Sequence, residues 1–449
     1  METKLARIAE AAKVRPSEKF TSLAHLINER TLAERHRKME IGKASGVDGE
    51  TKATYSENLE ANLQDLVARM KRQAYKPQPA LRKYIPKQGT DKMRPLGLPS
   101  YEDKLVQGVL AKILGAIYEQ DFLDCSHGFR PGRGCHEALR QLGEIIETRR
   151  VNYILDADIR GFFDHVDHEW LMKFVAHRVA DPNVLRLIQR FLKAGVMEAG
   201  IVYDTPEGTP QGGVISPLLA NVYLHYVLDL WFEKAVKRAC RGEAYMVRYA
   251  DDFVCCFQYE DDAKAFYGWL KERLKKFGLE IAEEKTRIIA FGRQAWQSHN
   301  NGGDKPGTFD FLGFTHYCGT SRGGWFRVKR KTSRKKYRAS LQRVYEWLAK
   351  NRHLPMRVMM RTLRPKVAGN HRYYGITDNL PMLRKFNYQV RKALYKWLNR
   401  RSQRRSLTWE QLDKFLKAFP LPKPVIHVNI YRVKRPLPRS EWRSEEPCA

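Results

Sequence analysis

The sequence predicts an α+β protein in which one sheet domain is followed by a basic helical region. Residues 152–158 have the apolar pattern of a core strand, and residues 244–257 form two such strands around a tight turn. Helical segments lie between and around these strands, so strands and helices belong to one sheet domain. After about residue 325 the chain continues as basic helices that are rich in aromatic residues.

The charge of the chain points to a polyanionic partner. With 449 residues, 43% of them hydrophobic, the chain is long enough for two or three packed domains. Lys and Arg total 81 against 50 Asp and Glu, which gives a formal net charge of +31. Such an excess destabilises a compact chain by self-repulsion, and nucleic acid is the polyanion that usually relieves it. An anionic membrane surface is the alternative, but the sequence carries no lipid-anchor signal.

The cysteines and the N-terminal residues favour a cytoplasmic protein. The seven Cys show no C-x-x-C spacing and no zinc-ligand pairing with His, so we expect no structural zinc. Cys255 and Cys256 are adjacent on a predicted strand and fit small core residues. The first residues lack the apolar region of a signal peptide. The most apolar run, 214–232, is interrupted by polar residues and predicts a buried helix without membrane contact.

The first 120 or so residues are predicted to be helical apart from one hairpin. Charged helices occupy 1–43, a turn follows at 45–51, and apolar residues at helical spacing predict a helix over about 56–73. The stretches LRKYIPK and MRPLGLP are two short strands around Gly89, which makes a basic hairpin. Residues 101–121 are a long, largely inward-facing helix.

The sheet domain continues through residue 320. A loop rich in Gly and Arg at 125–139 ends in a helix, and Ser216 and Pro217 fit the N-cap and N1 positions of another. Residues 261–277 predict a helix and 279–291 a strand region. The stretches FDFLGFTHY and GWFRVKR predict one more hairpin.

Carboxylates gather at the ends of two predicted strands. Asp251 and Asp252 lie in the turn of YADDFVCCF, and Asp158 ends the strand 152–158 with Asp156 two residues earlier on the same face. Adjacent Asp residues in a turn are commonly only turn formers. Here the flanking strands are apolar enough to be buried, so the carboxylates would converge at a rigid edge. Two Mg²⁺ ions, which prefer oxygen ligands and catalyse phosphoryl displacement as a pair, are the cations that such a site suits.

The ordered motifs resemble those of one family. DADIRGFFD, TPQGGVISPLLANVYL, YADD and FLGF, preceded by GVDGET, YIPKQGTDKMRPLGLPSYEDKLVQ and SHGFRPGRGCHEAL, resemble the reverse transcriptases and maturases encoded by group II introns. The resemblance is clear over about residues 20–320 and looser to about 400. It implies a right-hand polymerase with fingers and palm and an α-helical thumb, domain X. The expected divisions are an N-terminal extension with the start of the fingers (1–80), fingers and palm (81–320), thumb (321–417) and a weakly packed, Pro-rich basic tail (418–449).

The resemblance also assigns roles to residues. It implies that Asp158 and Asp251 bridge two Mg²⁺ ions, that Asp252 supports them, and that the backbone carbonyl of Ile159 is a further ligand. Asp156 and Asp164 are expected to be structural. Lys285, in EEKTRI, is similar to the acid that protonates the departing pyrophosphate, with a solvated lysine as the alternative.

Substrate contacts follow from the same resemblance. Phe163 matches an aromatic gate that excludes the 2′-hydroxyl of ribonucleotides, with a core position as the alternative. Lys87 and Arg94 match residues that grip the incoming triphosphate, for which their charges are suited, and Gln211 matches a nucleotide contact. The expected template and primer contacts are Gly212, Gly213, Gly313, Lys329, Arg330, Lys335, Lys336 and Arg338.

The basic stretch supports a nucleic-acid contact in the expected thumb. From Arg322 to Arg343 there are ten Lys or Arg and no Asp or Glu. Charge runs are usually solvated faces, but a run without any acid argues for phosphates. Tyr373 and Tyr374 are expected to stack on a ligand or to pack in the core.

The resemblance implies an RNA-directed DNA polymerase that uses dNTPs, an RNA template with a DNA primer, and intron RNA that it helps to fold for splicing. Two alternatives remain: a splicing-only maturase, and a host-adapted reverse transcriptase in repair or phage defence. A splicing-only protein should have lost a carboxylate or the PQGG loop, and this sequence keeps both. The paired Cys and His of the nuclease module in many family members are absent from the sequence, so mobility is expected to depend on a primer from a nick or replication fork.

Overall fold

The computed structural model describes residues 2–86, 93–205, 207–209, 212–401 and 407–431. Its central sheet has the order β6-β7-β3-β8, and every neighbouring pair is antiparallel. The strands are β3 (Tyr153–Asp158), β6 (Ala244–Tyr249), β7 (Asp252–Phe257) and β8 (Arg287–Ala290).

The two faces of the central sheet are buried in different cores. Because side chains alternate along a strand, Leu155 and Cys255 face a large core that includes α9 (Ser216–Leu224) and α11 (Glu260–Lys276). Ile154 and Cys256 face the opposite core, beneath α6 (Cys135–Thr148). Both cysteines are fully buried, as expected for small core residues.

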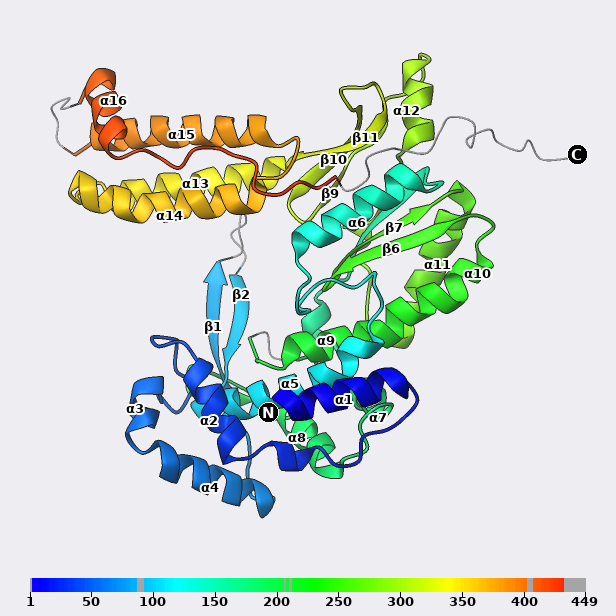
Figure 1. The fold of residues 1–449 in the computed structure, drawn as a ribbon, viewed down its shortest axis with the longest axis vertical. Helices are drawn as coiled ribbons and strands as arrows, with labels where there is room; N and C mark the ends of the chain where they lie inside the picture. Colours follow the sequence, from blue (N-terminus) through cyan, green and yellow to red (C-terminus); the bar gives the residue numbers. More distant parts are fainter. Residues whose placement is uncertain (1, 87–92, 206, 210–211, 402–406, 432–449) are drawn as a thin grey trace, which may run out of the picture.

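Helices surround a second sheet at the N-terminal end. This sheet has the order β2-β1-β4-β5, and its β1–β2 hairpin points toward the C-terminal helices in Figure 1. The elements are α1 (Glu2–Val14), α2 (Glu29–Lys38), α3 (Lys52–Glu57), α4 (Leu59–Lys71), β1 (Ala80–Pro86), β2 (Met93–Leu98), α5 (Tyr101–Asp121), α7 (His168–Ala176), α8 (Pro182–Leu192), β4 (Val196–Glu198) and β5 (Ile201–Tyr203). More than half of the residues of α5 are buried, and α1 packs along this helix.

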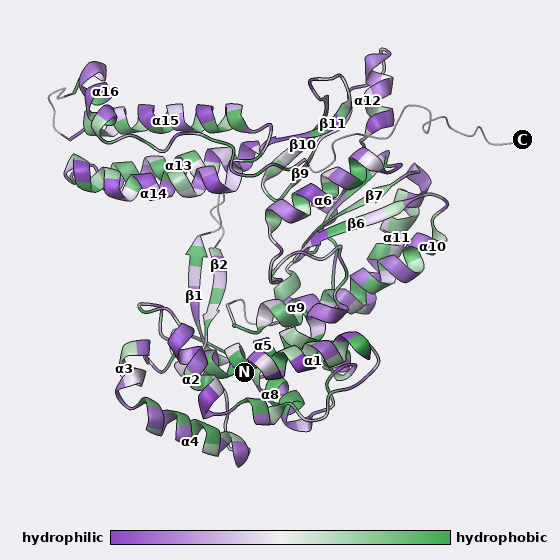
Figure 2. Cartoon of the chain, viewed as in Figure 1, coloured by the Kyte–Doolittle hydropathy of each residue, from purple (hydrophilic) through white to green (hydrophobic). Residues whose placement is uncertain are grey.

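A three-stranded sheet joins the central sheet to the C-terminal helices. It has the order β11-β10-β9, with β9 (Phe309–Phe311), β10 (Phe314–Thr320) and β11 (Phe326–Thr332), and α12 (Arg293–Asn300) lies beside it. The helices α13 (Arg334–Lys350), α14 (Met356–Tyr374), α15 (Leu380–Leu398) and α16 (Trp409–Ala418) have a core of their own. Figure 2 shows hydrophobic and hydrophilic residues alternating along these helices, as amphipathic packing requires.

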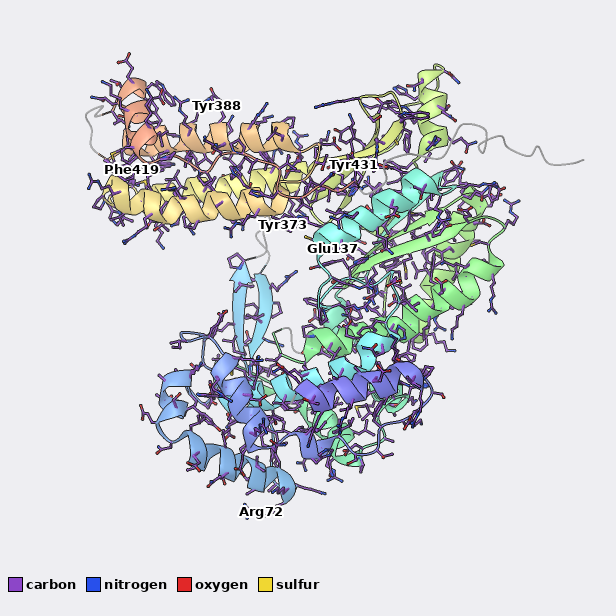
Figure 3. All side chains as sticks on the ribbon, viewed as in Figure 1. Arg72, Glu137, Tyr373, Tyr388, Phe419 and Tyr431 are labelled. Atoms are coloured by element: carbon purple, nitrogen blue, oxygen red, sulfur yellow. The ribbon has the colours of Figure 1, made fainter. Side chains whose placement is uncertain are left out.

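The chain returns from the helical bundle to the sheet domain. After α16, the backbone N–H groups of His427 and Val428 both donate to the carbonyl of Gly375, at 2.7 and 3.1 Å. Ile430 is 2% exposed and belongs to the same core as the central sheet, and Tyr431 lies between the bundle and α6 in Figure 3. The expected tail therefore contacts the protein at His427, Val428 and Ile430, whereas Val425 and Ile426 before them are exposed. The remainder of that expected tail lies outside the described residues.

Most predicted elements form near their predicted bounds. The helix expected at 101–121 has these bounds, but the one expected at 56–73 is two helices, α3 and α4, that meet at Asn58. The strand region 279–291 contains only the short β8, and Ile215 rather than Ser216 is the N-cap residue of α9. No helix in the described part of the chain is long and apolar enough to cross a membrane.

Candidate active site

The three predicted carboxylates meet at one edge of the central sheet. Asp158 is the last residue of β3 and Asp252 the first of β7, and the two residues are cross-strand partners. Asp251 precedes Asp252 in the turn from β6. Strand register thus brings together residues more than ninety positions apart in the sequence.

The turn that carries Asp251 has an unusual backbone. Tyr249 pairs with Asp252, so Ala250 and Asp251 are the two central residues of a tight hairpin turn. Ala250 has a φ of +57°, a left-handed conformation that costs a residue other than glycine about 1–2 kcal/mol. The surrounding structure must stabilise this turn.

The carboxylates disfavour one another's ionisation. Asp252 is open to the cleft but surrounded by protein atoms, and this partial desolvation, with the charges of Asp251 and Asp158, raises its pKa to about 7. Burial, and then the charge of Asp158, also raises the pKa of Asp251, which Arg94 and Arg248 oppose. A bound cation would relieve this repulsion.

Lys285 and Asp156 are two further charged groups beside the three carboxylates. Lys285, which follows two glutamates in a short 3₁₀ turn, forms an ion pair with Asp158, and that hydrogen bond raises the pKa of the ammonium group. Burial raises the pKa of Asp156 to about 6, and the cross-strand neighbour Arg287 opposes this rise. The ammonium of Lys285 therefore supplies the positive charge that Asp158 faces in this structure.

The donor set fits Mg²⁺ that is shared with a substrate. Within the described residues, no three His, Cys, Asp or Glu side chains form a metal cluster on their own. Mg²⁺ at phosphate-transfer sites commonly takes one or two carboxylates and completes its shell with water and substrate phosphates. Asp158, Asp251 and Asp252 supply such oxygens at a solvent-accessible edge, which suits an ion that arrives with a nucleotide.

A cleft of about 1010 Å³ lies over the carboxylates. The edge of the central sheet forms one side of this cleft, and α13 and α14 form the opposite wall. Figure 3 shows Tyr373 where the helical bundle meets the sheet domain. The wall residues on the two helices are Lys335, Lys336, Ser340, Arg343, Val344, Trp347, Lys366, Gly369, Asn370, Tyr373 and Tyr374.

The predicted nucleotide contacts that the structure describes are not among the residues that line this cleft. Arg94 is exposed on β2 and close enough to Asp251 to lower the pKa of that carboxyl. Phe163 is half-buried beside Phe162, which is 2% exposed, and their ring centroids lie 5.2 Å apart. The predictions for Lys87 and Gln211 fall outside the described residues. Ile159 follows β3 directly and is buried.

Two of the three predicted glycines occupy positions that require glycine. Gly313 has a φ of +82° and, with Leu312 at +49°, forms the tight β9–β10 turn that lines the cleft. Gly212 has a φ of +113°, and a Cβ there would lie 2.5 Å from the carbonyl oxygen of Gly97. The backbone of Gly212 therefore lies close to strand β2, whereas the sequence analysis predicts a close approach of Gly212 to the template. Gly213 is buried.

Only some of the predicted basic residues face the cleft. Lys335 and Lys336 line it. The prediction for Arg330 is wrong, because this residue is 1% exposed and its guanidinium donates to the carbonyls of Leu139 and Val328. The stem of Lys329 packs on Gly319, and Arg338 is exposed on α13 outside the cleft lining. Where a run of basic residues forms a strand, every second side chain points inward, because side chains alternate between the two faces.

Sequence reasoning missed several residues of the site. Phe129 is 54% exposed, has a φ of +60° and lines the cleft beside the carboxylates. Asp310, on β9, lines it as well. Arg248 is fully buried directly beneath the YADD turn. A positive charge inside an apolar strand next to the motif was the available signal for Arg248.

The fold and the carboxylate edge match one family of proteins. A family model described as reverse transcriptase (RNA-dependent DNA polymerase) matches residues 85–316, which is more than half of the chain. The chain belongs to the reverse transcriptase family, whose palm and fingers the sheet domain represents.

Individual relatives confirm the resemblance to group II intron proteins. The chain is similar to the group II intron-encoded protein LtrA of Lactococcus lactis subsp. cremoris, with 32% identity over 63% of this chain and 57% of that protein. It is 35% identical to protein YkfC of Escherichia coli K12 over 72% of this chain and 90% of that protein. A shorter match links it to nuclear intron maturase 1 of Arabidopsis thaliana, 36% identical over 21% of this chain and 13% of that protein. The chain thus spans little more than half of the Lactococcus protein.

Proposed function

We propose that this chain is a group II intron reverse transcriptase that extends a DNA primer with dNTPs on an RNA template, using two Mg²⁺ ions. It also binds intron RNA as a maturase and so assists splicing and retromobility. The observation that carries the polymerase assignment is the cross-strand pairing of Asp158 with Asp252, with Asp251 in the adjoining turn, in a chain of this family.

The position of the cleft supports a right-hand arrangement. The central sheet is the palm, the β1–β2 hairpin with its surrounding helices is the fingers, and α13–α16 are the thumb (Figure 1). The cleft between the carboxylates and the wall of α13 and α14 holds the template and primer. The cationic side chains of that wall provide charges for phosphates of either strand.

Each side chain of the site then has a role in nucleotidyl transfer. Asp158, Asp251 and Asp252 hold the ions, with the Ile159 carbonyl as a further oxygen. Two bound Mg²⁺ ions would stabilise the charge on the attacking and leaving oxygens. Arg94 grips the triphosphate, and Lys285, charged through its contact with Asp158, holds at Nζ the proton that the departing pyrophosphate takes.

The direct test is primer extension on an RNA template with purified protein. Synthesis should require Mg²⁺, and Asp251→Ala should reduce the rate about a thousandfold or more. Because Asp251 is charged against the preference of its surroundings, this variant should melt no earlier than the parent. Asp261→Ala, on the exposed start of α11, is the matched control and should extend primers normally. Equal rates for Asp251→Ala and wild type would remove the assignment.

The splicing role is tested separately with the same variant. RNA binding by shape and phosphate contacts does not need the metal carboxylates, so Asp251→Ala should still accelerate splicing of the cognate intron. Splicing assistance by a wild-type protein that makes no DNA would favour the splicing-only alternative. DNA synthesis without any effect on intron RNA would favour a host-adapted enzyme.

A further inference from the structure

A buried arginine lies beneath the turn that carries Asp251. Arg248, on β6, is 0% exposed, and its guanidinium makes contacts in several directions. Nε and Nη2 donate to the two carboxylate oxygens of Asp229, at 2.7 and 2.5 Å. Nη1 donates to the carbonyl oxygen of Ala250 at 2.9 Å. The same side chain thus contacts a buried carboxylate and the backbone of the turn.

The remaining partners of Arg248 connect this turn to two other segments. Nη1 also donates to Asn221 Oδ1 at 3.1 Å, and Nη2 donates to Ser126 Oγ at 2.8 Å. Asn221 in turn donates to the carbonyl of Gly128 at 2.7 Å. Gly128 lies so close to the turn that a Cβ there would be 2.3 Å from the backbone nitrogen of Ala250.

The carboxylate partner comes from an irregular part of its helix. Asp229 is the last residue of a π-helical segment, His225–Asp229, that continues α9. Single π-helical turns are rare and are found frequently at functional sites. Asp229 is also 0% exposed, so the pair is removed from solvent on both sides.

A buried guanidinium must find partners for all five of its N–H donors, so the identity of those partners, rather than their number, indicates a role. A buried pair of charges is expensive to desolvate, and well-packed apolar residues often replace one without loss of stability. The donors of Arg248 that do not face Asp229 reach the turn and the segments that touch it. The residue that they contact, Ala250, has the left-handed backbone that the turn requires. The geometry therefore favours a role in fixing the turn.

We propose that Arg248, held by Asp229, is a positioning residue for the metal-binding carboxylates. Its hydrogen bond to the Ala250 carbonyl fixes the backbone immediately before Asp251, and so fixes where Asp251 and Asp252 stand relative to Asp158. This inference rests on the proposed function. A misplacement of about 1 Å in such a site can cost about a hundredfold in rate.

Two variants separate positioning from stability. Arg248→Lys keeps the charge opposite Asp229 but lacks the planar fork that reaches both the carboxylate and the turn. The double variant Arg248→Met with Asp229→Leu removes both charges together, so that neither is left buried alone. The matched control is Arg178→Lys. Arg178 is a 3% exposed arginine that pairs with Asp121 at 3.0 Å and donates to the carbonyl of Ala12 in α1.

The measurements are Mn²⁺ binding by electron paramagnetic resonance, single-turnover extension against Mg²⁺ concentration, primer–template affinity and thermal melting. For both Arg248 variants we expect at least about threefold weaker Mn²⁺ binding, a higher Mg²⁺ requirement and at least about a tenfold lower maximal rate. Primer–template affinity should not change. Arg178→Lys should lower the melting temperature and leave the metal dependence as in wild type.

The outcomes distinguish this inference from the proposed function. Wild-type Mn²⁺ affinity and maximal rate in either folded Arg248 variant would overturn the inference, as would an Arg178→Lys variant with the same metal defect. Mn²⁺ binding needs no turnover, so a wild-type protein that binds Mn²⁺ but makes no DNA would remove only the polymerase assignment. A wild-type protein that binds no Mn²⁺ would remove both.

Discussion

Phe163 and Phe162 are adjacent aromatic residues in different environments. Both lie in the short 3₁₀ turn Phe162–Asp164, which comes shortly after the strand that carries Asp158. Phe162 is 2% exposed in the large core, whereas Phe163 is half-buried. A ring with one free face can contact a sugar, and a fully buried ring cannot. The structure thus leaves Phe163 in a position that is compatible with the predicted sugar gate.

Replacing Phe163 with Ala should admit ribonucleotides. The space left by the ring would accept a 2′-hydroxyl, so we expect ribonucleotide incorporation relative to deoxynucleotide incorporation to rise about tenfold or more, since steric exclusion in a pocket contributes about 1–3 kcal/mol. Competition assays with dNTPs and rNTPs measure the ratio. Phe162→Ala is the control, because it should cost about 3–5 kcal/mol of stability without changing the ratio. Unchanged sugar discrimination in Phe163→Ala would rule out the gate.

His225 should make the stability of the protein depend on pH. Burial lowers the pKa of His225 to about 4; Asp229 opposes this, while Arg248, Arg130 and Lys234 add to it. The unfolded chain, with an ordinary His pKa of about 6.5, therefore binds more protons than the folded protein between pH 4 and 6.5. The free energy of unfolding should fall as the pH drops through that window, by up to about 3 kcal/mol from this residue.

The measurement is urea unfolding at several pH values between 4 and 7. His225→Phe removes the titrating group and keeps a flat ring beside Phe122 and Tyr226. Its stability should decline less steeply on acidification than that of wild type. Parallel curves for the two proteins would show that burial of His225 does not determine this dependence.

Among the elements, α14 contains a glycine that packing does not explain. Gly369 lies inside the helix on the wall of the cleft, and a Cβ there would meet nothing within 4 Å. Glycine inside a helix costs about 1 kcal/mol relative to alanine. A surface that must be approached closely by a ligand accounts for that cost.

Gly369→Ala should therefore stabilise the protein slightly and weaken its binding of primer–template. Thermal melting should rise or stay unchanged, while the dissociation constant should increase several-fold, and further in Gly369→Leu. Gly268→Ala on α11 is the matched control, because Gly268 is also free of neighbours within 4 Å but lies outside the cleft. Equal affinity in all three variants would contradict a ligand contact at Gly369.

The elements also show what the sequence could predict. The convergence of carboxylates was predictable because the strands 152–158 and 244–257 are apolar and carry Asp residues at their ends, and the tight turn sets the register of β6 with β7. The register of β3 with β7, which places Asp158 opposite Asp252, follows from no turn because these strands are far apart in the sequence. The burial of Arg330 was not predictable, because successive basic residues hide which side chains of a strand point inward and which point to solvent. Residues 165–205 contain α7, α8, β4 and β5, for which the sequence analysis predicts no element, although Asp181 and Pro182 are a helix-start signal and α8 has a one-sided apolar pattern.

At the scale of the whole molecule, the net charge of +31 predicts binding that weakens steeply with salt. Each phosphate contact contributes about 0.7–0.9 to the slope of log affinity against log salt concentration. Lys336→Gln, in the cleft wall, should lower that slope by about one contact. Arg338→Gln, on α13 outside the cleft lining, should leave it unchanged. Titrations of primer–template at several salt concentrations test both, and equal slopes for the two variants would contradict a specific contact at Lys336.

The return of the chain from α16 to Gly375 and Ile430 gives the helical bundle a second chain segment against the rest of the protein, in addition to side-chain contacts such as that of Tyr373 with the Leu312 carbonyl. The first segment is the direct continuation of β11 into α13, and the second is the segment 425–431 beside the start of α15. A body attached along two lines has fewer degrees of freedom than one attached by a single linker. We therefore expect the bundle to open and close around a substrate by a hinge rotation about a single axis, with a limited range. Free reorientation on a flexible linker is not expected.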